Sequence, residues 1–297
     1  MKKLKKAYIE ITNVCNLSCA FCPGTSRKPG FMGALEFETV LRKLQGFTDH
    51  VYLHVMGEPL LHPDLAKLLE LCRLYGYKVN ITTNGTLIKN KSEILLGSSA
   101  LRQVNFSVHS HEGIGNDTAG REAADQYLVN IFSYTDAALA KGGVYISYRL
   151  WNLTSEASEQ YNAYVVHKLQ QKFEPDFSIS EALTHQKRIT LRDRLYLNCA
   201  EVFQWPSGSA DNSGDKGFCL GLRDQAAILV DGTVVPCCLD SDGGIPLGNI
   251  FNEDFAAILE GNRARALYYG FSERRTVEEL CRKCGYRNRF SPSGTPP

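Results

Sequence analysis

The sequence predicts an α/β protein in two parts: a partial (β/α)6 barrel over residues 1–204 and a small α+β domain over residues 218–290. Short β-rich segments alternate with helical patterns six times, which is typical of a parallel sheet with right-handed crossovers. The region is too short for a complete eight-stranded barrel, which needs about 250 residues. A Gly/Ser/Asp-rich segment, WPSGSADNSGDKG at 205–217, then predicts a linker before the second part.

The six predicted strands are apolar, rich in β-branched or aromatic residues, and bounded by Gly, Asn or Pro. They are AYIEIT (7–12), VYLHVM (51–56), KVNITT (78–83), QVNFSV (103–108), VYISYRL (144–150) and FSISEAL (177–183). Helices are predicted at 64–75, 121–141 and 156–173, and the first repeats apolar residues with the spacing of one buried face. Sheets of this kind bind ligands at the carboxyl ends of their strands, so residues at those ends are the candidates for a site.

The C-terminal part begins with a predicted β-hairpin, AAILVDGTVVPC (226–237), whose turn is Asp231-Gly232. Two predicted helices follow and end at Cys281. The final segment, SPSGTPP (291–297), is predicted to be disordered.

Composition excludes several classes of protein. The 43% of hydrophobic and 22% of charged residues are those of an ordinary globular chain, and a formal charge of +1 provides no electrostatic surface for nucleic acid. The MKKLKK start lacks the apolar segment of a signal peptide, and no apolar run has transmembrane length. We therefore predict a cytoplasmic protein with no membrane or nucleic-acid partner, in which clustered cysteines bind metal rather than form disulfides.

Three cysteines lie directly after the first predicted strand, in VCNLSCAFC (14–22). Thiolates are soft ligands that suit iron–sulfur clusters, zinc and copper(I). Cys15, Cys19 and Cys22 can hold three irons of a four-iron cube and leave the fourth iron open. The alternative is a zinc site that takes its fourth ligand from His54 or His62.

The spacing C-x3-C-x-aromatic-C, with Phe21 as the aromatic residue, resembles the radical SAM superfamily. The resemblance implies that Cys15, Cys19 and Cys22 hold a [4Fe–4S] cluster whose open iron binds S-adenosylmethionine (SAM), and that Phe21 lies near the adenine. It also implies reductive cleavage of SAM to methionine and a 5′-deoxyadenosyl radical, with a flavodoxin- or ferredoxin-type protein as electron donor.

Residues after the second predicted strand resemble the G-G-E-P motif of the same family, with Met56 in place of the first glycine. The resemblance implies that Gly57 lets the backbone approach the methionyl amine of SAM. Glu58, which precedes Pro59, would order the turn or neutralise that amine.

Three further residues at the ends of predicted strands match the family by position. Asn84 follows the third strand, Ser107 resembles the residue that contacts the SAM ribose, and Arg149 resembles the arginine that pairs with the SAM carboxylate. Polar pairing inside the barrel is the alternative for Ser107 and Arg149.

A second set of cysteines lies in the C-terminal part: Cys219, Cys237, Cys281 and Cys284. Four thiolates can close either a zinc site or a cluster. The C-x12-G-x4-C and C-x2-C spacings resemble the twitch domain, a shortened SPASM domain, and are closest to those of 2-deoxy-scyllo-inosamine dehydrogenases. The resemblance implies one auxiliary [4Fe–4S] cluster that transfers electrons. If only three of these cysteines bound it, the open iron could hold the substrate instead.

The presence of two clusters predicts an oxidation in two steps. A small polar molecule loses a hydrogen atom to the 5′-deoxyadenosyl radical, and the resulting substrate radical then loses an electron to the auxiliary cluster and a proton to a base. Asp240 and Arg149 are the candidate bases, although Asp240 also fits a polar turn with residues 241–244. Glu10 and Asn13, near the end of the first strand, could also face the cavity.

Two other functions stay open. One is modification of a peptide side chain, which the short stretch before Cys15 makes less favoured. The other is a non-enzymatic zinc or redox-sensing protein. Outside these sites, Cys72 is predicted in the apolar core and Cys199 in a buried helix, whereas His109 either contacts substrate or lies in a solvated loop.

Overall fold

The computed structural model describes residues 3–111, 118–153, 158–207 and 214–290. They form two compact units that alternate along the chain. The first unit contains residues 1–16, 22–79 and 203–297, and the second contains residues 17–21 and 80–202.

The sheet of the first unit has the strand order β10-β9-β8-β1-β2. β1 is parallel to β2, with Ala7 opposite Val51, and to β8, with Lys6 opposite Gln225. β9 is antiparallel to both β8 and β10. The bounds are β1 Lys6–Ile9, β2 His50–Tyr52, β8 Gln225–Ile228, β9 Thr233–Val235 and β10 Gly248–Asn249.

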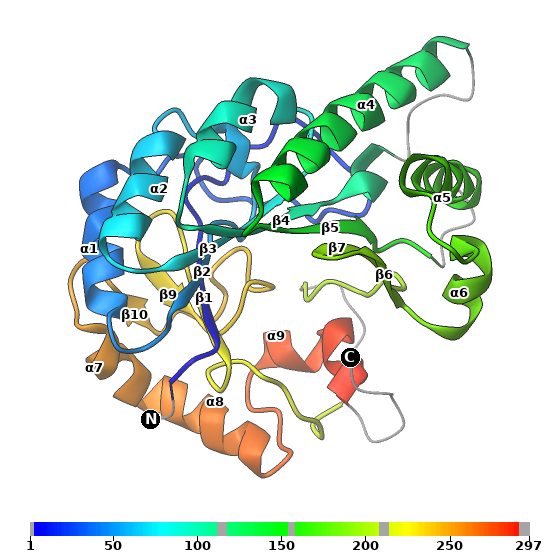
Figure 1. The fold of residues 1–297 in the computed structure, drawn as a ribbon. Helices are drawn as coiled ribbons and strands as arrows, with labels where there is room; N and C mark the ends of the chain where they lie inside the picture. The colour runs from blue at the N-terminus through cyan, green and yellow to red at the C-terminus, as the bar shows by residue number, and fades with distance from the viewer. Residues whose placement is uncertain (1–2, 112–117, 154–157, 208–213, 291–297) are drawn as a thin grey trace. The chain divides into compact units, whose positions relative to one another are not determined.

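The helices of the first unit pack in pairs, α1 against α2 and α7 against α8 (Figure 1). α2 buries Leu65, Leu68, Leu69 and Cys72, which confirms the predicted apolar face and the core position of Cys72. The bounds are α1 Ala34–Leu44, η1 Pro59–Leu61, α2 Leu65–Leu74, α7 Phe255–Glu260, α8 Asn262–Ser272, α9 Glu279–Arg282 and η4 Gly285–Phe290, where η marks a 3-10 helix.

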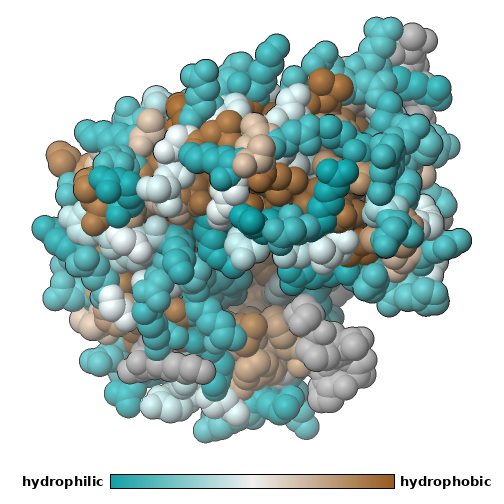
Figure 2. All heavy atoms as spheres, viewed as in Figure 1, coloured by the Kyte–Doolittle hydropathy of each residue, from teal (hydrophilic) through white to brown (hydrophobic). Residues whose placement is uncertain are grey.

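The second unit contains strands in the order β3-β4-β5-β7-β6, with β4 parallel to β5 and β5 parallel to β7. Figure 2 shows a mainly hydrophilic surface over its helices α4 and α5. Within the described residues, no helix is long and apolar enough to cross a membrane. The bounds are β3 Lys78–Thr83, which begins in the first unit, α3 Ile88–Gly97, β4 Leu101–Phe106, η2 Val108–His111, α4 Thr118–Lys141, β5 Tyr145–Leu150, α5 Glu159–Phe173, α6 Ile179–His185, β6 Arg188–Arg192 and β7 Leu195–Cys199.

The prediction of a sixth strand at 177–183 is wrong, because these residues begin α6. Ser178 is the N-cap, its hydroxyl accepts a hydrogen bond from the backbone N–H of Glu181 at 3.3 Å, and Ser-x-x-Glu is a helix-start signal. The sixth parallel strand is instead β7, which follows antiparallel β6. Cys199 is therefore buried at the end of a strand, not in the predicted helix.

The predicted hairpin at 226–237 is present as β8 and β9. Gly232 occupies its turn with a φ of +84°, and an added Cβ would meet the Phe251 ring at 2.5 Å. Three helices follow in the described residues, α7, α8 and α9, rather than the predicted two. Because β8 pairs with β1, this hairpin extends the sheet of the first unit. One boundary between the compact units lies between residues 202 and 203, close to the predicted linker, but the residues after it belong to the same unit as residues 1–16 and 22–79.

The end of the predicted linker belongs to the folded C-terminal part. Lys216 forms a β-bridge with Arg275, and the Thr276 N–H donates to the Asp215 carbonyl at 2.7 Å. Residues 208–213 and the predicted tail at 291–297 lie outside the described residues.

Candidate functional site

The three-cysteine loop leaves the carboxyl end of β1, as predicted. Cys15 and Cys22 are exposed and Cys19 is half-buried. Asn13 holds the base of the loop closed, because its side chain donates to the Lys28 carbonyl at 3.0 Å and accepts from the Gly30 N–H at 2.8 Å. These contacts occupy both ends of the Asn13 amide, which gives this buried residue a structural role.

The Gly57-Glu58-Pro59 turn packs directly on the chain that precedes Cys15. Gly57 has a φ of +75°, and a Cβ there would lie 2.5 Å from the Thr12 carbonyl oxygen and 2.8 Å from that of Val14. The Glu58 N–H also donates to the Val14 carbonyl at 2.8 Å. A glycine is needed here because only Gly combines this backbone conformation with so close an approach.

The Glu58 side chain is buried and accepts a hydrogen bond from the Leu60 N–H at 2.9 Å, which caps η1. This contact agrees with the predicted role of Glu58 in ordering the turn. Its predicted role beside the SAM amine stays a prediction.

Glu10 joins three segments of the first unit. Its fully buried carboxylate accepts from the Arg27 guanidinium at 2.6 Å, the Met56 N–H at 3.1 Å and the Val230 N–H at 3.0 Å. The Arg27 Nε–H donates in turn to the Ser241 carbonyl at 2.8 Å. The loop after Cys22, the turn before Gly57 and the β8–β9 turn therefore meet at one carboxylate.

The middle of the cysteine loop, residues 17–21, packs within the second unit against η2. The Cys19 thiol lies 3.8 Å from the Ser110 carbonyl oxygen, and the Phe21 ring centroid lies 4.7 Å from that of His109. His109 is buried and its Nδ1 lies 2.9 Å from the Arg149 carbonyl oxygen. The structure thus buries His109 rather than placing it in a solvated loop, and its position directly after a predicted strand is the sequence signal for this contact.

The other predicted SAM contacts also lie at strand ends of the second unit. The Ser107 N–H donates to the Thr83 carbonyl at 2.9 Å, which places Ser107 beside the segment that contains Asn84. Arg149 lies on β5, with Nη1 3.3 Å from Thr82 Oγ1 and its guanidinium 4.7 Å from the Trp151 ring centroid. The roles of these residues toward SAM stay predictions.

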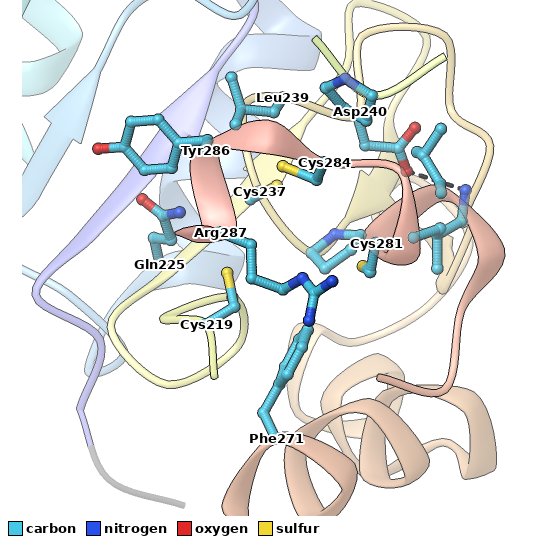
Figure 3. A pocket seen from close by; sticks show the side chains of 15 residues that line it. Cys219, Gln225, Cys237, Leu239, Asp240, Phe271, Cys281, Cys284, Tyr286 and Arg287 are labelled. Carbon is cyan, nitrogen blue, oxygen red and sulfur yellow. Dashed lines mark hydrogen bonds between the residues drawn. The ribbon is translucent and has the colours of Figure 1, made fainter. Parts of the chain in front are cut away.

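The four remaining predicted ligands line one cavity of the first unit (Figure 3). Cys219 precedes β8, Cys237 follows β9, Cys281 lies in α9, and Cys284 follows α9. Burial raises the pKa of Cys219 to about 11, and burial is also the main cause that raises the pKa of the other three thiols. A metal bound here would displace these protons, because thiolates are the ligands.

Backbone amides are directed at two of these thiols. Cys219 is hydrogen-bonded to the amides of Leu220 and Gly221, and Cys284 to those of Tyr286 and Arg287. Hydrogen bonds to the sulfurs are a means by which proteins hold iron–sulfur clusters and set their potentials. Four thiols around a cavity with amide donors therefore fit a fully ligated [4Fe–4S] cluster.

The contacts of His62 bear on the alternative of a zinc site. His62 uses both ring nitrogens, Nε2 at 3.1 Å from the Met32 carbonyl oxygen and Nδ1 as the acceptor for the Asp64 N–H at 3.1 Å, so it is held in a structural role rather than as a zinc ligand. Across the part of the chain that the structure describes, no three His, Cys, Asp or Glu side chains are arranged to hold a single metal ion.

Asp240 lines the same cavity, but both of its carboxylate oxygens bind backbone. They accept from the Gly244 N–H at 2.7 Å and the Ile245 N–H at 2.8 Å, which forms the polar turn that was the alternative for this residue. Burial raises the pKa of Asp240. Cys238, next to Cys237, packs instead against an apolar cluster that includes Tyr8 and Met56.

Comparison with known proteins identifies two domains. Residues 9–133 match the model of the radical SAM superfamily, and residues 219–285 match the SPASM model, an iron–sulfur cluster-binding domain. A probable GTP 3′,8-cyclase of Methanothermobacter thermautotrophicus is 22% identical over 88% of this chain and 94% of its own. Matches to several other curated relatives are partial and cover 18% to 33% of the lengths of those proteins.

Solved structures confirm the predicted fold class. BtrN in complex with AdoMet and 2-DOIA is similar over 95% of this chain and 93% of that chain, with a TM-score of 0.57 and 17% identity. Streptococcus suis SuiB bound to the precursor peptide SuiA is similar over 99% of this chain and 72% of that chain, with a TM-score of 0.61 and 18% identity.

Both matched domains contain the cysteines predicted for them. Cys15, Cys19 and Cys22 lie in the first, and Cys219, Cys237, Cys281 and Cys284 lie in the second. The chain therefore contains a radical SAM domain and a SPASM-type iron–sulfur domain, and these domains indicate SAM and [4Fe–4S] clusters as its cofactors.

Proposed function

We propose that this radical SAM enzyme oxidises a small polar molecule by two electrons and that the auxiliary cluster accepts one of them. The observation that carries the proposal is the set of four half-buried cysteines whose thiols line one cavity (Figure 3). Such a set supplies a protein ligand for every iron, so it leaves no iron for substrate and suits electron transfer. The three cysteines of the first loop leave one iron for SAM.

When bound, the clusters and SAM supply the one-electron and radical chemistry, and the protein positions the reactants and shields them. We propose that Gly57 and Glu58 fix the loop of Cys15 for SAM binding, and that Phe21, held against His109, packs near the adenine. Ser107 and Asn84 would contact the rest of SAM from their strand ends, and Arg149 its carboxylate.

The proton that leaves the substrate needs an acceptor, for which Asp240 is the proposed carboxylate; the Arg149 guanidinium is already protonated and would instead contact SAM or substrate. Protonation of Asp240 would weaken one of its two hydrogen bonds to backbone amides. This cost favours a structural role for Asp240 and leaves Arg149, with its barrel-strand position, as the residue to test first for substrate contact.

Similarity along nearly the whole of BtrN, which was solved with AdoMet and the small molecule 2-DOIA, supports a small substrate. Modification of a peptide is the second candidate. The similarity to SuiB, which was solved with a precursor peptide, has a higher TM-score than the similarity to BtrN, which favours this candidate. It ranks second because the similarity covers only 72% of the SuiB chain. We further propose a flavodoxin- or ferredoxin-type electron donor.

Anaerobic reconstitution tests the proposal. We expect about eight irons per chain, about four for each cluster, and formation of 5′-deoxyadenosine when dithionite and SAM are added. Bound zinc, or a loaded protein that leaves SAM intact, would support the non-enzymatic alternative instead. Candidate small polar alcohols and peptides, each deuterated at the reacting carbon, then identify the substrate class by deuterium transfer into 5′-deoxyadenosine.

A further inference from the structure

Arg287 is a buried cation in the wall of the auxiliary-cluster cavity. It lies in η4, three residues after Cys284, and only 3% of its surface is exposed. Its guanidinium donates to the carbonyls of Lys216 at 2.6 Å and Gly214 at 2.9 Å, and to Thr276 Oγ1 at 2.9 Å. All of these acceptors are neutral, so none of them compensates the charge.

Among the residues described, no carboxylate compensates the charge of Arg287. Their ion pairs do not include Arg287, and its buried Nε has no hydrogen-bond partner in the protein. Taking an unpaired charge out of water costs several kcal/mol. A buried, unpaired guanidinium with a spare N–H therefore calls for an anion in the cavity.

The groups around Arg287 identify where that anion would lie. Its charge acts on the thiols of Cys219 and Cys284, and its side chain enters the cavity that the four thiols line (Figure 3). The guanidinium packs directly against the Gly217 backbone, since an added Cβ at Gly217 would collide with Nη1. The cation is thus held beside the ligands of the auxiliary cluster rather than free to turn toward solvent.

We infer that Arg287 raises the reduction potential of the auxiliary cluster by placing its charge and its Nε–H beside the cluster. A cube bound by four thiolates is anionic and becomes more so on reduction, so a neighbouring cation favours the reduced state. This inference rests on the proposed function, in which an electron passes from the substrate radical to that cluster while a proton passes to a base. Arg287 is then a positioning residue that makes electron uptake more favourable.

Redox titration of the full chain tests the inference, with the cluster followed by electron paramagnetic resonance. Cys15, Cys19 and Cys22 are replaced by Ala, so that the auxiliary cluster is the one that titrates. We expect Arg287→Gln to lower the ratio of reduced to oxidised cluster about tenfold at a fixed poise, which is about 59 mV for one electron. Arg287→Lys, which keeps the charge, should retain most of the original potential.

Arg282→Gln is the matched control. Arg282 lies between Cys281 and Cys284, but its side chain is 34% exposed and is paired with Asp215 at 2.8 Å, so its loss should leave the potential unchanged. An unchanged potential in a fully loaded Arg287→Gln protein would overturn the inference, and so would an equal shift in Arg282→Gln. If Arg287→Gln takes up no cluster, the loaded Lys variant decides: a potential near the original supports the inference, and a fall of about 59 mV refutes it.

If neither Arg287 variant takes up the auxiliary cluster, the inference is also overturned, because Arg287 would then be needed for cluster assembly rather than for the reduction potential.

Iron analysis separates these results from failure of the proposed function. If the triple Ala protein with intact Arg287 holds no iron, the auxiliary cluster itself is absent and the proposed function fails first.

Discussion

The two cysteine sets differ in burial and in what surrounds them. Cys15 and Cys22 are exposed on a loop, whereas the four thiols near β8 and α9 line a cavity, where Cys219 and Cys284 receive backbone hydrogen bonds. An exposed set suits an iron that must exchange a ligand with solvent. A half-buried set that offers a ligand for every iron suits a centre that only gains and loses electrons, because limited contact with water and fixed donors set its potential.

The two sets are also held by different means. The four-cysteine cavity is built from its own segment, with amides at the residues that follow Cys219 and Cys284. The three-cysteine loop depends on nearby Glu10 and on two positions far away in sequence, Gly57 and the turn at Asp242. Substitutions far from the loop in sequence should therefore affect it.

The largest effect is expected from the ligands themselves. Cys22→Ala should lower 5′-deoxyadenosine formation more than about a thousandfold, because Cys22 is a proposed ligand of the cluster that would cleave SAM. Cys281→Ala should spare SAM cleavage yet abolish substrate turnover. Both are measured by chromatography of 5′-deoxyadenosine and product. Loss of SAM cleavage in a folded Cys281→Ala protein would show that the two sets do not divide the work in this way.

Gly57→Ala should be the most destabilising of the loop-support variants. The left-handed conformation costs an ordinary residue about 1–2 kcal/mol, and the clash of Cβ with backbone adds about 1–3 kcal/mol. Gly76→Ala is the matched control, because Gly76 has a φ of +76° but nothing within 4 Å of the added Cβ. Urea unfolding and SAM binding measure both. Equal losses of unfolding free energy in Gly57→Ala and Gly76→Ala would show that the close approach of Gly57 to the Val14 carbonyl does not contribute to stability.

Glu10→Gln should lower the free energy of unfolding by about 3 kcal/mol, because it leaves the Arg27 charge without its buried partner. Glu70→Gln removes the partner of Arg73 in an exposed pair, where both side chains are about half exposed, so it should change the free energy of unfolding much less than Glu10→Gln does. Thermal unfolding compares them. The same small change in both variants would mean that Glu10 does not organise the loop.

Strand and helix patterns predicted most of the barrel, and the failure at 177–183 has a physical cause. FSISEAL alternates apolar and polar residues as a strand does, but Ser178 and Glu181 also form a helix N-cap, and the cap prevails. The sixth parallel strand of the structure is β7, which pairs with the antiparallel strand β6 that precedes it. The apolar pattern of a single strand does not indicate which strand it pairs with.

The two cysteine sets could be proposed as ligands from the sequence alone, because cysteines that bind metal recur at characteristic spacings along a chain. Contacts between distant segments could not. Nothing local in the sequence indicates that Glu10 binds Arg27 and the Val230 amide, or that Arg287 enters the auxiliary cavity. Such side chains acquire a role only when the fold brings their segments together.

The smallest effect tests how the C-terminal part supports the three-cysteine loop. Asp242 Oδ1 accepts hydrogen bonds from Thr25 Oγ1 at 2.6 Å and the Ser26 N–H at 2.9 Å, just after Cys22. Asp242→Asn should cost about 1 kcal/mol and weaken SAM binding several-fold, because charged acceptors at partly exposed sites contribute modestly. Asp254→Asn is the control, since Asp254 is 85% exposed and contacts Lys43 only at 3.8 Å. Calorimetry of SAM binding to both reconstituted proteins measures the effect. Weaker binding in Asp242→Asn alone would mean that the four-cysteine domain shapes the loop on which SAM is bound, whereas equal affinities would leave the two sites structurally independent.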